Sequence, residues 1–273
     1  MTVVTAHAGE KLQQKATAGP LLEGKDISVT FGRGAEAFDA VRAASVTVHS
    51  GEAVGIVGES GSGKTTLARA LVGLQRPSAG EVWLEGERLY SAAAERRLPR
   101  SERWKTQMIF QDPYSSLNPR MRVWQAVAEA VQVWKSLPGA EARVQALQLL
   151  NAMGISDDQA RQFPKSLSGG QRQRVSVARA LAPDPKVLIA DEPTSSIDQS
   201  AQAQLLNLLR RLQSERGLAI IFISHDLGLV RYLTSRVYVM QKGDVVEAGK
   251  TEDVLERPQH SYTRLLIDSI PGR

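Results

Sequence analysis

The sequence of 273 residues contains no cysteine and no long apolar run. Without cysteine, the chain cannot form disulfides, hold an iron–sulfur cluster or bind zinc through thiolates. Apolar stretches such as residues 218–223 are far shorter than the ~20 residues that cross a bilayer, so any membrane role depends on partners. Residues 1–20 lack the apolar core of a signal peptide, so we expect a flexible leader on a protein that stays in the cytosol.

The charge balance is weakly basic. Lys and Arg number 34 against 29 Asp and Glu, which gives a formal net charge of +5. Such a balance raises the question of a nucleic acid or an anionic membrane as partner. The densest basic stretch comprises Arg96, Arg97, Arg100, Arg103 and Lys105. We interpret this stretch as a solvated face, and we expect no nucleic-acid partner.

Three short apolar stretches have the character of strands and end in polar residues. Residues 53–57 lead into a glycine-rich turn, residues 187–190 into two acids, and residues 218–223 into Ser224 and His225. Such strands, alternating with helical patterns, indicate an α/β chain with a parallel sheet. Ligands bind beyond the carboxyl ends of the strands in open α/β sheets, so we predict that the three endings line one crevice.

The segment from about residue 113 to residue 171 has a helical pattern throughout. Apolar residues recur at helical spacing in two stretches, 123–134 and 146–153. Residues 136–140, which include Leu-Pro-Gly, separate the two helices. We therefore predict a helical subdomain inserted into the α/β core.

The strongest motif fits the phosphate-binding pattern G-x-x-x-x-G-K-S/T and runs from Gly58 to Thr65. It follows an apolar strand and precedes a predicted helix from Lys64 to Leu71, so backbone N–H groups and a helix N-terminus converge where a phosphate fits. Glycine is needed because a side chain would block that approach. We predict that Lys64 neutralises the β- and γ-phosphates and that the Thr65 hydroxyl binds Mg²⁺.

Asp191 and Glu192 form an acidic pair at the end of an apolar strand. A carboxylate at this edge can reach Mg²⁺ directly or through water, which is the role predicted for Asp191. Glu192 can accept a proton from, or orient, the water that attacks the γ-phosphate. In isolation, adjacent acids before a proline are better explained as a helix N-cap. The phosphate-binding motif reverses that preference.

The stretch Leu167-Ser168-Gly169-Gly170-Gln171 resembles the signature motif of the ATP-binding cassette (ABC) family. Its Ser and Gly residues open a predicted helix from about Gln171 to Leu181, which makes a second anion site plausible on physical grounds. The resemblance covers the chain from about Leu22 to Ile270, with the motifs in the family's order. It implies a P-loop NTPase (RecA-like) α/β core with an antiparallel β subdomain and the inserted helical subdomain, over residues 21–273.

The resemblance also implies roles for individual residues. Gln111 matches the Q-loop glutamine, which contacts Mg²⁺ or the attacking water, and His225 matches the switch histidine, which contacts the γ-phosphate. Phe31 or Phe38 stands where the family places a ring against adenine. Residues 195–198, Ser-Ser-Ile-Asp, stand at the D-loop, which usually reads Ser-Ala-Leu-Asp. ATP and Mg²⁺ are the implied ligands.

The expected catalytic residues are Glu192, His225 and Gln111, and the expected metal-binding residues are Thr65, Gln111 and Asp191. The expected nucleotide-binding residues are Phe31, Gly58, Glu59, Ser60, Gly61, Ser62, Gly63, Lys64, Thr65, Thr66, Asp191, Ser168, Gly169, Gly170 and Gln171. In this family the signature motif of one subunit closes over the nucleotide on the P-loop of another, so a dimer is implied.

Two segments resemble one branch of the family. Residues 110–120 resemble the Q-loop region of importer ATPases for dipeptides, oligopeptides and nickel. Residues 257–263, in a C-terminal extension that runs to residue 273, resemble that group's Pro-x-His-Pro-Tyr-Thr element, with Ser261 in place of the second Pro. A short terminal helix is predicted to carry an apolar stripe of Tyr262, Leu265 and Leu266.

The resemblance therefore implies the ATPase subunit of a bacterial ABC importer for peptides or a similar small solute, peripheral to the cytoplasmic face of the inner membrane. The implied partners are two integral membrane permease subunits, a second identical or different cassette and, indirectly, an extracytoplasmic solute-binding protein. Residues 111–134 are expected to dock a permease helix through exposed residues 114–118.

Other functions remain open at this point. A soluble cassette ATPase that serves an enzyme complex, such as carbon–phosphorus lyase, shares much of the pattern, although residues 111–120 favour transport. A nucleic-acid-handling cassette usually carries zinc modules, long coiled coils or tandem cassettes, none of which this sequence contains. Glu192 disfavours a nucleotide-binding regulator without hydrolysis.

Overall fold

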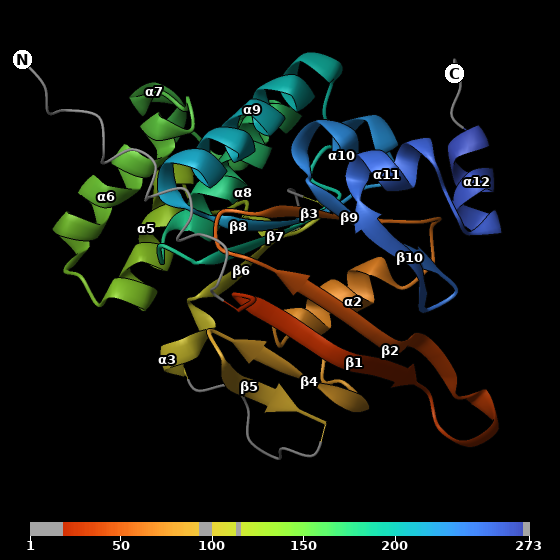
Figure 1. The fold of residues 1–273 in the computed structure, drawn as a ribbon. Coiled ribbons are helices and arrows are strands. Elements are labelled where there is room, and N and C mark those ends of the chain that lie inside the picture. The colour runs from red at the N-terminus through yellow and green to blue at the C-terminus, as the bar shows by residue number, and fades with distance from the viewer. Residues whose placement is uncertain (1–18, 93–99, 113–115, 270–273) are drawn as a thin grey trace, which may run out of the picture.

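Two β-sheets and a set of helices make up the residues that the structure, a computed structural model, describes: 19–92, 100–112 and 116–269 (Figure 1). The larger sheet has the strand order β10-β9-β3-β8-β7-β6. Its strands are β3 (Ala53–Val57), β6 (Thr106–Ile109), β7 (Val187–Asp191), β8 (Ala219–Ile223), β9 (Arg236–Gln241) and β10 (Asp244–Lys250). Strand β10 is antiparallel to β9, and the other neighbouring pairs are parallel. The predicted α/β core is thereby confirmed.

The three strands that the sequence predicts, β3, β7 and β8, are the neighbours at the centre of this sheet. Side chains alternate between the faces of a strand, and both faces are covered here. Val54 and Ile56 lie in the apolar cluster of one face, and Ala53 and Val57 lie in that of the other. Burial on both faces explains why these strands are continuous apolar runs. Because β3, β7 and β8 are parallel, their carboxyl ends meet at one edge.

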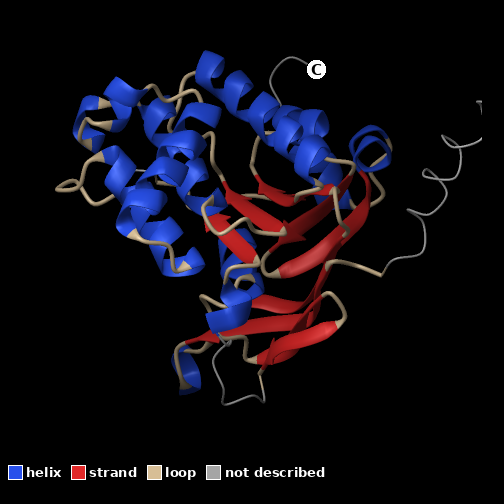
Figure 2. Ribbon diagram, turned by 90° about the vertical axis from the view of Figure 1, so that its left-hand side faces the viewer, coloured by secondary structure: helices blue, strands red, loops and turns tan. Residues whose placement is uncertain are grey.

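The smaller sheet is antiparallel and has the order β2-β1-β4-β5. Its strands are β1 (Leu22–Phe31), β2 (Phe38–Val48), β4 (Ala79–Leu84) and β5 (Glu87–Ser91), with a 3-10 helix at Gly34–Glu36 between the first two. Helix α2 (Lys64–Leu71) contacts β1, β2 and β7, so it lies between the two sheets (Figure 2). The antiparallel subdomain is thus confirmed as well.

Helix α2 covers one face of the larger sheet, and a layer of other helices covers the opposite face (Figure 2). A first group follows β6 and precedes β7, which confirms the inserted helical subdomain: α5 (Val123–Lys135), α6 (Gly139–Ala152), α7 (Asp157–Ala160), a 3-10 helix (Pro164–Ser166) and α8 (Gly169–Leu181). The others on this face are α9 (Gln199–Arg216), α10 (Leu227–Leu233), α11 (Thr251–Glu256) and α12 (Ser261–Asp268). Helix α3 (Arg100–Arg103) lies apart from them, near β5, and contacts β6 (Figure 1). No helix in the described ranges is both long and apolar enough to cross a membrane.

Two expectations about solvent exposure are wrong. The terminal helix α12 exists, but Leu265 is 68% exposed, whereas Tyr262, Thr263 and Ile267 are buried. At about 100° per residue around the helix axis, the buried residues Tyr262, Thr263 and Ile267 share one face of the helix, and Leu265 points away from that face. Leu117 was expected on an exposed docking surface and is only 3% exposed, because it belongs to the core beneath the helices.

Several expectations concern residues whose structure is undescribed. Residues 1–18 of the predicted leader, Arg96 and Arg97 of the basic stretch, and residues 114 and 115 lie outside the described ranges. Within that basic stretch, the ammonium of Lys105 forms ion pairs with Glu102 at 2.7 Å and Glu85 at 3.2 Å. The division into a leader and one cassette domain stays a prediction.

Candidate functional site

The phosphate-binding motif forms the loop between β3 and α2, and two of its glycines are required by close packing. A Cβ on Gly58 would lie 2.1 Å from the carbonyl oxygen of Met240, and one on Gly63 would lie 2.3 Å from that of Ala40. Both glycines also have positive φ, +149° and +104°. Only glycine adopts such a backbone at low cost, so these positions preserve the shape of the loop.

Lys64 is buried at the start of α2, beneath this loop. Its Nζ donates to the carbonyl oxygens of Gly58 at 2.8 Å and Glu59 at 2.7 Å, and it lies 3.4 Å from Ser62 Oγ. Burial lowers the pKa of the ammonium, although the nearby carboxylates, of which Glu192 has the largest effect, act in the opposite direction. The first N–H groups of a helix have no intrahelical acceptor, so loop, lysine and helix together suit an anion.

Asp191 and Thr65 form the next layer of the site. The hydroxyl of Thr65, in the first turn of α2, donates to Oδ1 of Asp191, the last residue of β7, at 3.0 Å. Burial raises the pKa of Asp191, while the hydrogen bond from Thr65 opposes that shift. A hydroxyl and a carboxylate side by side are hard oxygen ligands, so the pair fits Mg²⁺.

Gln111, Glu192 and His225 come together around one carboxylate oxygen, although they follow three different strands. Gln111 Nε2 donates to Glu192 Oε2 at 2.9 Å, and His225 Nδ1 lies 3.5 Å from the same oxygen. Glu192 has a φ of +43°, a strained value for a residue with a side chain. Its N–H donates to the carbonyl of Ile223 at 3.0 Å, which holds the strained turn in place. This half-buried carboxylate can accept a proton from a water molecule.

The signature stretch forms the N-terminus of α8. Ser168 Oγ accepts the N–H of Gln171 at 3.3 Å, and the Gln171 side chain accepts the N–H of Ser168 at 2.9 Å. This reciprocal capping box begins the helix at Gly169, two residues earlier than the sequence predicts. Asp198, at the end of the D-loop, caps α9 by accepting the N–H of Ala201 at 2.9 Å. The contact seen for Asp198 is therefore structural.

The signature and the D-loop segment pack closely through the signature glycines. A Cβ on Gly169 would lie 3.0 Å from the carbonyl oxygen of Ser196, and one on Gly170 would lie 2.7 Å from the Cβ of Ala201. Small residues at both positions therefore let α8 approach the start of α9. A change in this contact would move the signature relative to the D-loop.

Gly170→Ala is expected to lower the free energy of unfolding by about 1–3 kcal/mol, because the new methyl overpacks the contact with Ala201. Gly139→Ala is the control, since it also places a methyl in the first turn of a helix. There the nearest atom is the flexible end of Gln132 at 3.3 Å. Denaturant titration of both variants measures the difference, and equal stabilities would contradict the tight packing at Gly170.

Two aromatic rings, rather than one, stand where adenine stacking was predicted. Phe31 and Phe38 pair across the β1–β2 hairpin, with ring centroids 5.7 Å apart. Phe31 is 36% exposed and Phe38 is 61% exposed. The two therefore form one exposed aromatic surface.

Sequence reasoning missed a residue at the phosphate-binding loop. The N–H of Glu59 donates to the Tyr262 hydroxyl at 2.9 Å, across 203 residues. The sequence indicates that Tyr262 lies on a terminal helix, but no spacing or periodicity places that helix beside the loop. The loop residues Glu59, Ser60 and Gly61 are exposed.

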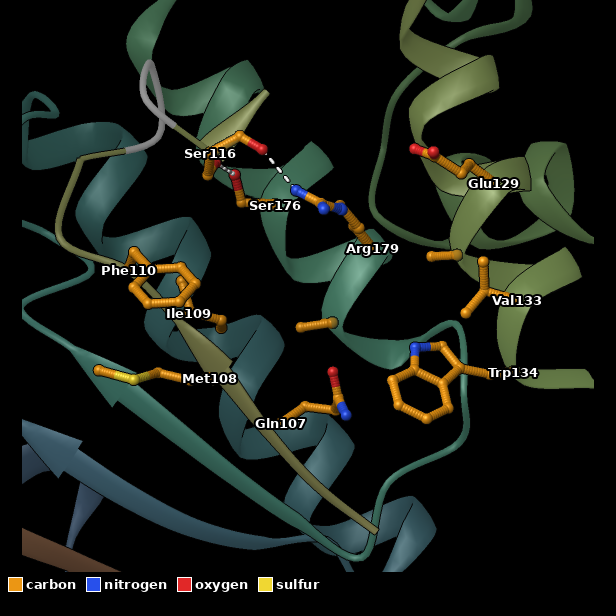
Figure 3. Close-up of a pocket in the computed structure, with 12 residues that line it drawn as sticks. Gln107, Met108, Ile109, Phe110, Ser116, Glu129, Val133, Trp134, Ser176 and Arg179 are labelled. Atoms are coloured by element: carbon orange, nitrogen blue, oxygen red, sulfur yellow. Dashed lines mark hydrogen bonds between the residues drawn. The ribbon is translucent and has the colours of Figure 1, made fainter. Parts of the chain in front are cut away.

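A groove lies between β6, α5 and α8, with a cavity volume of about 360 Å³ (Figure 3). Phe110, Val133 and Trp134 supply apolar walls, and Arg179 and Ser116 supply polar ones. The Arg179 guanidinium donates to the carbonyl of Ser116. Phe110 directly precedes Gln111, so the wall of the groove is one residue away from the amide that donates to the Glu192 carboxylate.

Comparison with known proteins agrees with this geometry. The sequence model described as "ABC transporter" matches residues 41–195, and that described as "Oligopeptide/dipeptide transporter, C-terminal region" matches residues 246–272. The oligopeptide transport ATP-binding protein OppF of Streptococcus mutans is 44% identical over 92% of this chain and 82% of its own length. OppF of Bacillus subtilis is 42% identical over the same shares.

Solved structures show the same fold. The dimeric post-hydrolysis state of the ATP-binding cassette MJ0796, bound to ADP and Pi, has a TM-score of 0.76 at 29% identity and covers 84% of this chain and 98% of its own. CbiO1 from Clostridium perfringens, part of the ABC transporter complex cbiONQ, has a TM-score of 0.75 at 28% identity. It covers 87% of this chain and 91% of its own.

Proposed function

This chain belongs to the ABC transporter family of ATPases, and we propose that its ATP hydrolysis powers the uptake of oligopeptides through a membrane permease. The match of its C-terminal region to that of oligopeptide and dipeptide transporters supports this solute class. The observation that carries the transport function is the Gln111–Glu192 hydrogen bond, because Gln111 directly follows Phe110, which lines a groove suited to a partner.

ATP binding begins at the loop between β3 and α2. Lys64 Nζ is held at the loop by two backbone carbonyls, and its positive charge there offsets the charge of the triphosphate. Thr65 and Asp191 are the residues that would hold Mg²⁺, which when bound supplies further neutralisation of the phosphates. Phe31 and Phe38 offer the aromatic surface for adenine.

Hydrolysis depends on the Glu192 carboxylate. Glu192 takes the proton of the attacking water, while Gln111 and His225 both lie against its Oε2. A hydrogen bond from Gln111 restricts the orientation of Glu192, so a movement of the Q-loop changes the position of the base. His225 is exposed and therefore accessible to the γ-phosphate of a bound nucleotide.

A second cassette completes each site. The capped N-terminus of α8, with Ser168, Gly169 and Gly170, presents backbone N–H groups that suit a phosphate held by another chain. Two copies arranged head to tail would place each signature over the partner's phosphate-binding loop. The proposed assembly is a cassette dimer, peripheral to the cytoplasmic face of the membrane, beneath two permease subunits.

The permease docks in the groove between β6, α5 and α8. Its apolar walls and its Arg179 suit an amphipathic helix at a membrane surface. A permease helix that displaces Phe110 would also displace Gln111, the next residue in the chain. Gln111 would in turn shift Glu192, to which it is hydrogen-bonded. Docking and hydrolysis are thereby coupled.

Val133→Glu is expected to remove the permease subunits from the purified complex while basal ATP hydrolysis continues, because a charge in the groove opposes the docking of an apolar helix. Val144→Glu is the control, since Val144 lies on α6 outside the groove and is 55% exposed, against 44% for Val133. Affinity purification from native membranes, followed by identification of the subunits, measures the result.

Three results would contradict the proposal. Retention of the permease by Val133→Glu would exclude the groove as the docking site. Loss of the permease from both variants would show a general effect of surface charge. A wild-type chain that recovers only soluble partners would favour an ATPase that serves an enzyme complex.

A further inference from the structure

The terminal helix α12 contributes a side chain directly to the phosphate-binding loop. Tyr262 is buried, and its ring packs within the apolar cluster on the helical face of the larger sheet. Its hydroxyl accepts the N–H of Glu59 at 2.9 Å. A side chain from the last segment of the chain thus fixes the second residue of the motif.

One peptide unit joins Tyr262 to Lys64. The N–H of Glu59 and the carbonyl of Gly58 belong to the same planar peptide group, and in a trans peptide they point in opposite directions. On one side the N–H reaches the Tyr262 hydroxyl, and on the other the carbonyl accepts Lys64 Nζ at 2.8 Å. A rotation of this peptide therefore breaks both contacts together.

This peptide needs an external restraint because it follows a glycine in an unusual conformation. Gly58 has a φ of +149°, in a region that only glycine enters at low cost. Glycine also has the widest range of alternative conformations, so its preferences alone do not hold the adjoining peptide. The hydroxyl of Tyr262, a buried residue, supplies a fixed acceptor.

Tyr262 is itself held firmly at the start of α12. The Glu247 carboxylate of β10 accepts the N–H groups of Gln259 at 2.9 Å and His260 at 3.0 Å. His260 Nδ1 then caps the helix by accepting the N–H of Tyr262 at 3.2 Å. Strand β10 therefore anchors the segment that carries the tyrosine.

We propose that Tyr262 is a positioning residue for nucleotide binding: its hydroxyl holds the Gly58–Glu59 peptide in the orientation that keeps Lys64 within the loop. The inference rests on the proposed role of this loop in binding ATP. Without the hydroxyl, the loop spends part of its time in other orientations, and the apparent affinity for nucleotide is multiplied by the fraction that remains competent. The net worth of one hydrogen bond corresponds to a change of about fivefold.

Tyr262→Phe tests this role, because it removes the hydroxyl and keeps the ring. We expect KM and Kd for ATP to rise about fivefold while kcat stays within about twofold, since the chemistry at Glu192 is untouched. Tyr238→Phe is the matched control: Tyr238 is also buried, and its hydroxyl accepts a backbone N–H, that of Thr47, at 3.0 Å. It is expected to leave KM and Kd unchanged at a similar cost in thermal stability.

Amide hydrogen exchange supplies a readout that does not depend on activity. Exchange at Glu59 should become faster in Tyr262→Phe and not in Tyr238→Phe, with the reverse pattern at Thr47. Unchanged KM, Kd and Glu59 exchange in Tyr262→Phe would overturn the proposal, as would an equal rise of KM in both variants. Normal hydrolysis by the wild-type chain in the same assay shows that such a failure concerns Tyr262 and not the ATPase function.

Discussion

Replacing Glu192 by Gln is expected to lower kcat for ATP hydrolysis by about 10²- to 10⁴-fold, the usual contribution of a general base. The amide has nearly the shape of the carboxylate but cannot accept the proton of the attacking water. Nucleotide affinity should remain close to that of the wild type, because Lys64 and the loop are unchanged. Equilibrium binding of ATP and steady-state phosphate release measure the two quantities separately.

Glu85→Gln provides the control for loss of one carboxylate. Glu85 forms ion pairs with Lys105 and Lys186, and Lys186 immediately precedes β7, at the end opposite to Asp191. This change should leave turnover as it is, since it removes a charge far from the carboxyl edge of the sheet. Undiminished turnover in Glu192→Gln would reject Glu192 as the base.

A mixed dimer is expected to recover hydrolysis that both of its parent homodimers lack. Ser168→Arg fills the signature with a long side chain, so its homodimer should bind ATP on intact loops without hydrolysing it. Lys64→Ala removes the buried ammonium from the loop, so its homodimer should fail to bind MgATP tightly. In the mixture, one intact loop faces one intact signature across the interface, and one composite site becomes competent.

Ser156→Arg controls for the loss of a helix cap in this experiment. Ser156 caps α7 through the same reciprocal pairing, with Gln159 in the place that Gln171 takes in α8. Both substitutions remove a cap worth about 1 kcal/mol, but only Ser168→Arg obstructs the signature. Phosphate release from covalently linked dimers is the measurement. A mixed dimer without activity, beside an active wild-type dimer, would exclude the head-to-tail arrangement.

The local parts of this protein follow from its sequence. The span of α2 and the strands at the centre of the larger sheet agree with the apolar runs and the glycine spacing to within one or two residues. Periodicity and turn chemistry are properties of neighbouring residues, so a short window contains the whole signal. The strand endings also predict that Glu192 and His225 line one crevice, whereas the role of His225 and the place of Gln111 came from resemblance to a family. The roles of all three residues remain predictions.

The tertiary structure alone decided which distant segments meet. Leu117 and Leu265 were assigned to the wrong environments because burial depends on what packs against a residue, and hydropathy does not name the neighbour. The hydrogen bond from Glu59 to Tyr262 depends on β10 and α11 returning the chain to the edge of the sheet beside the phosphate-binding loop. Contacts of this kind arise from strand order and helix docking, which no local pattern specifies.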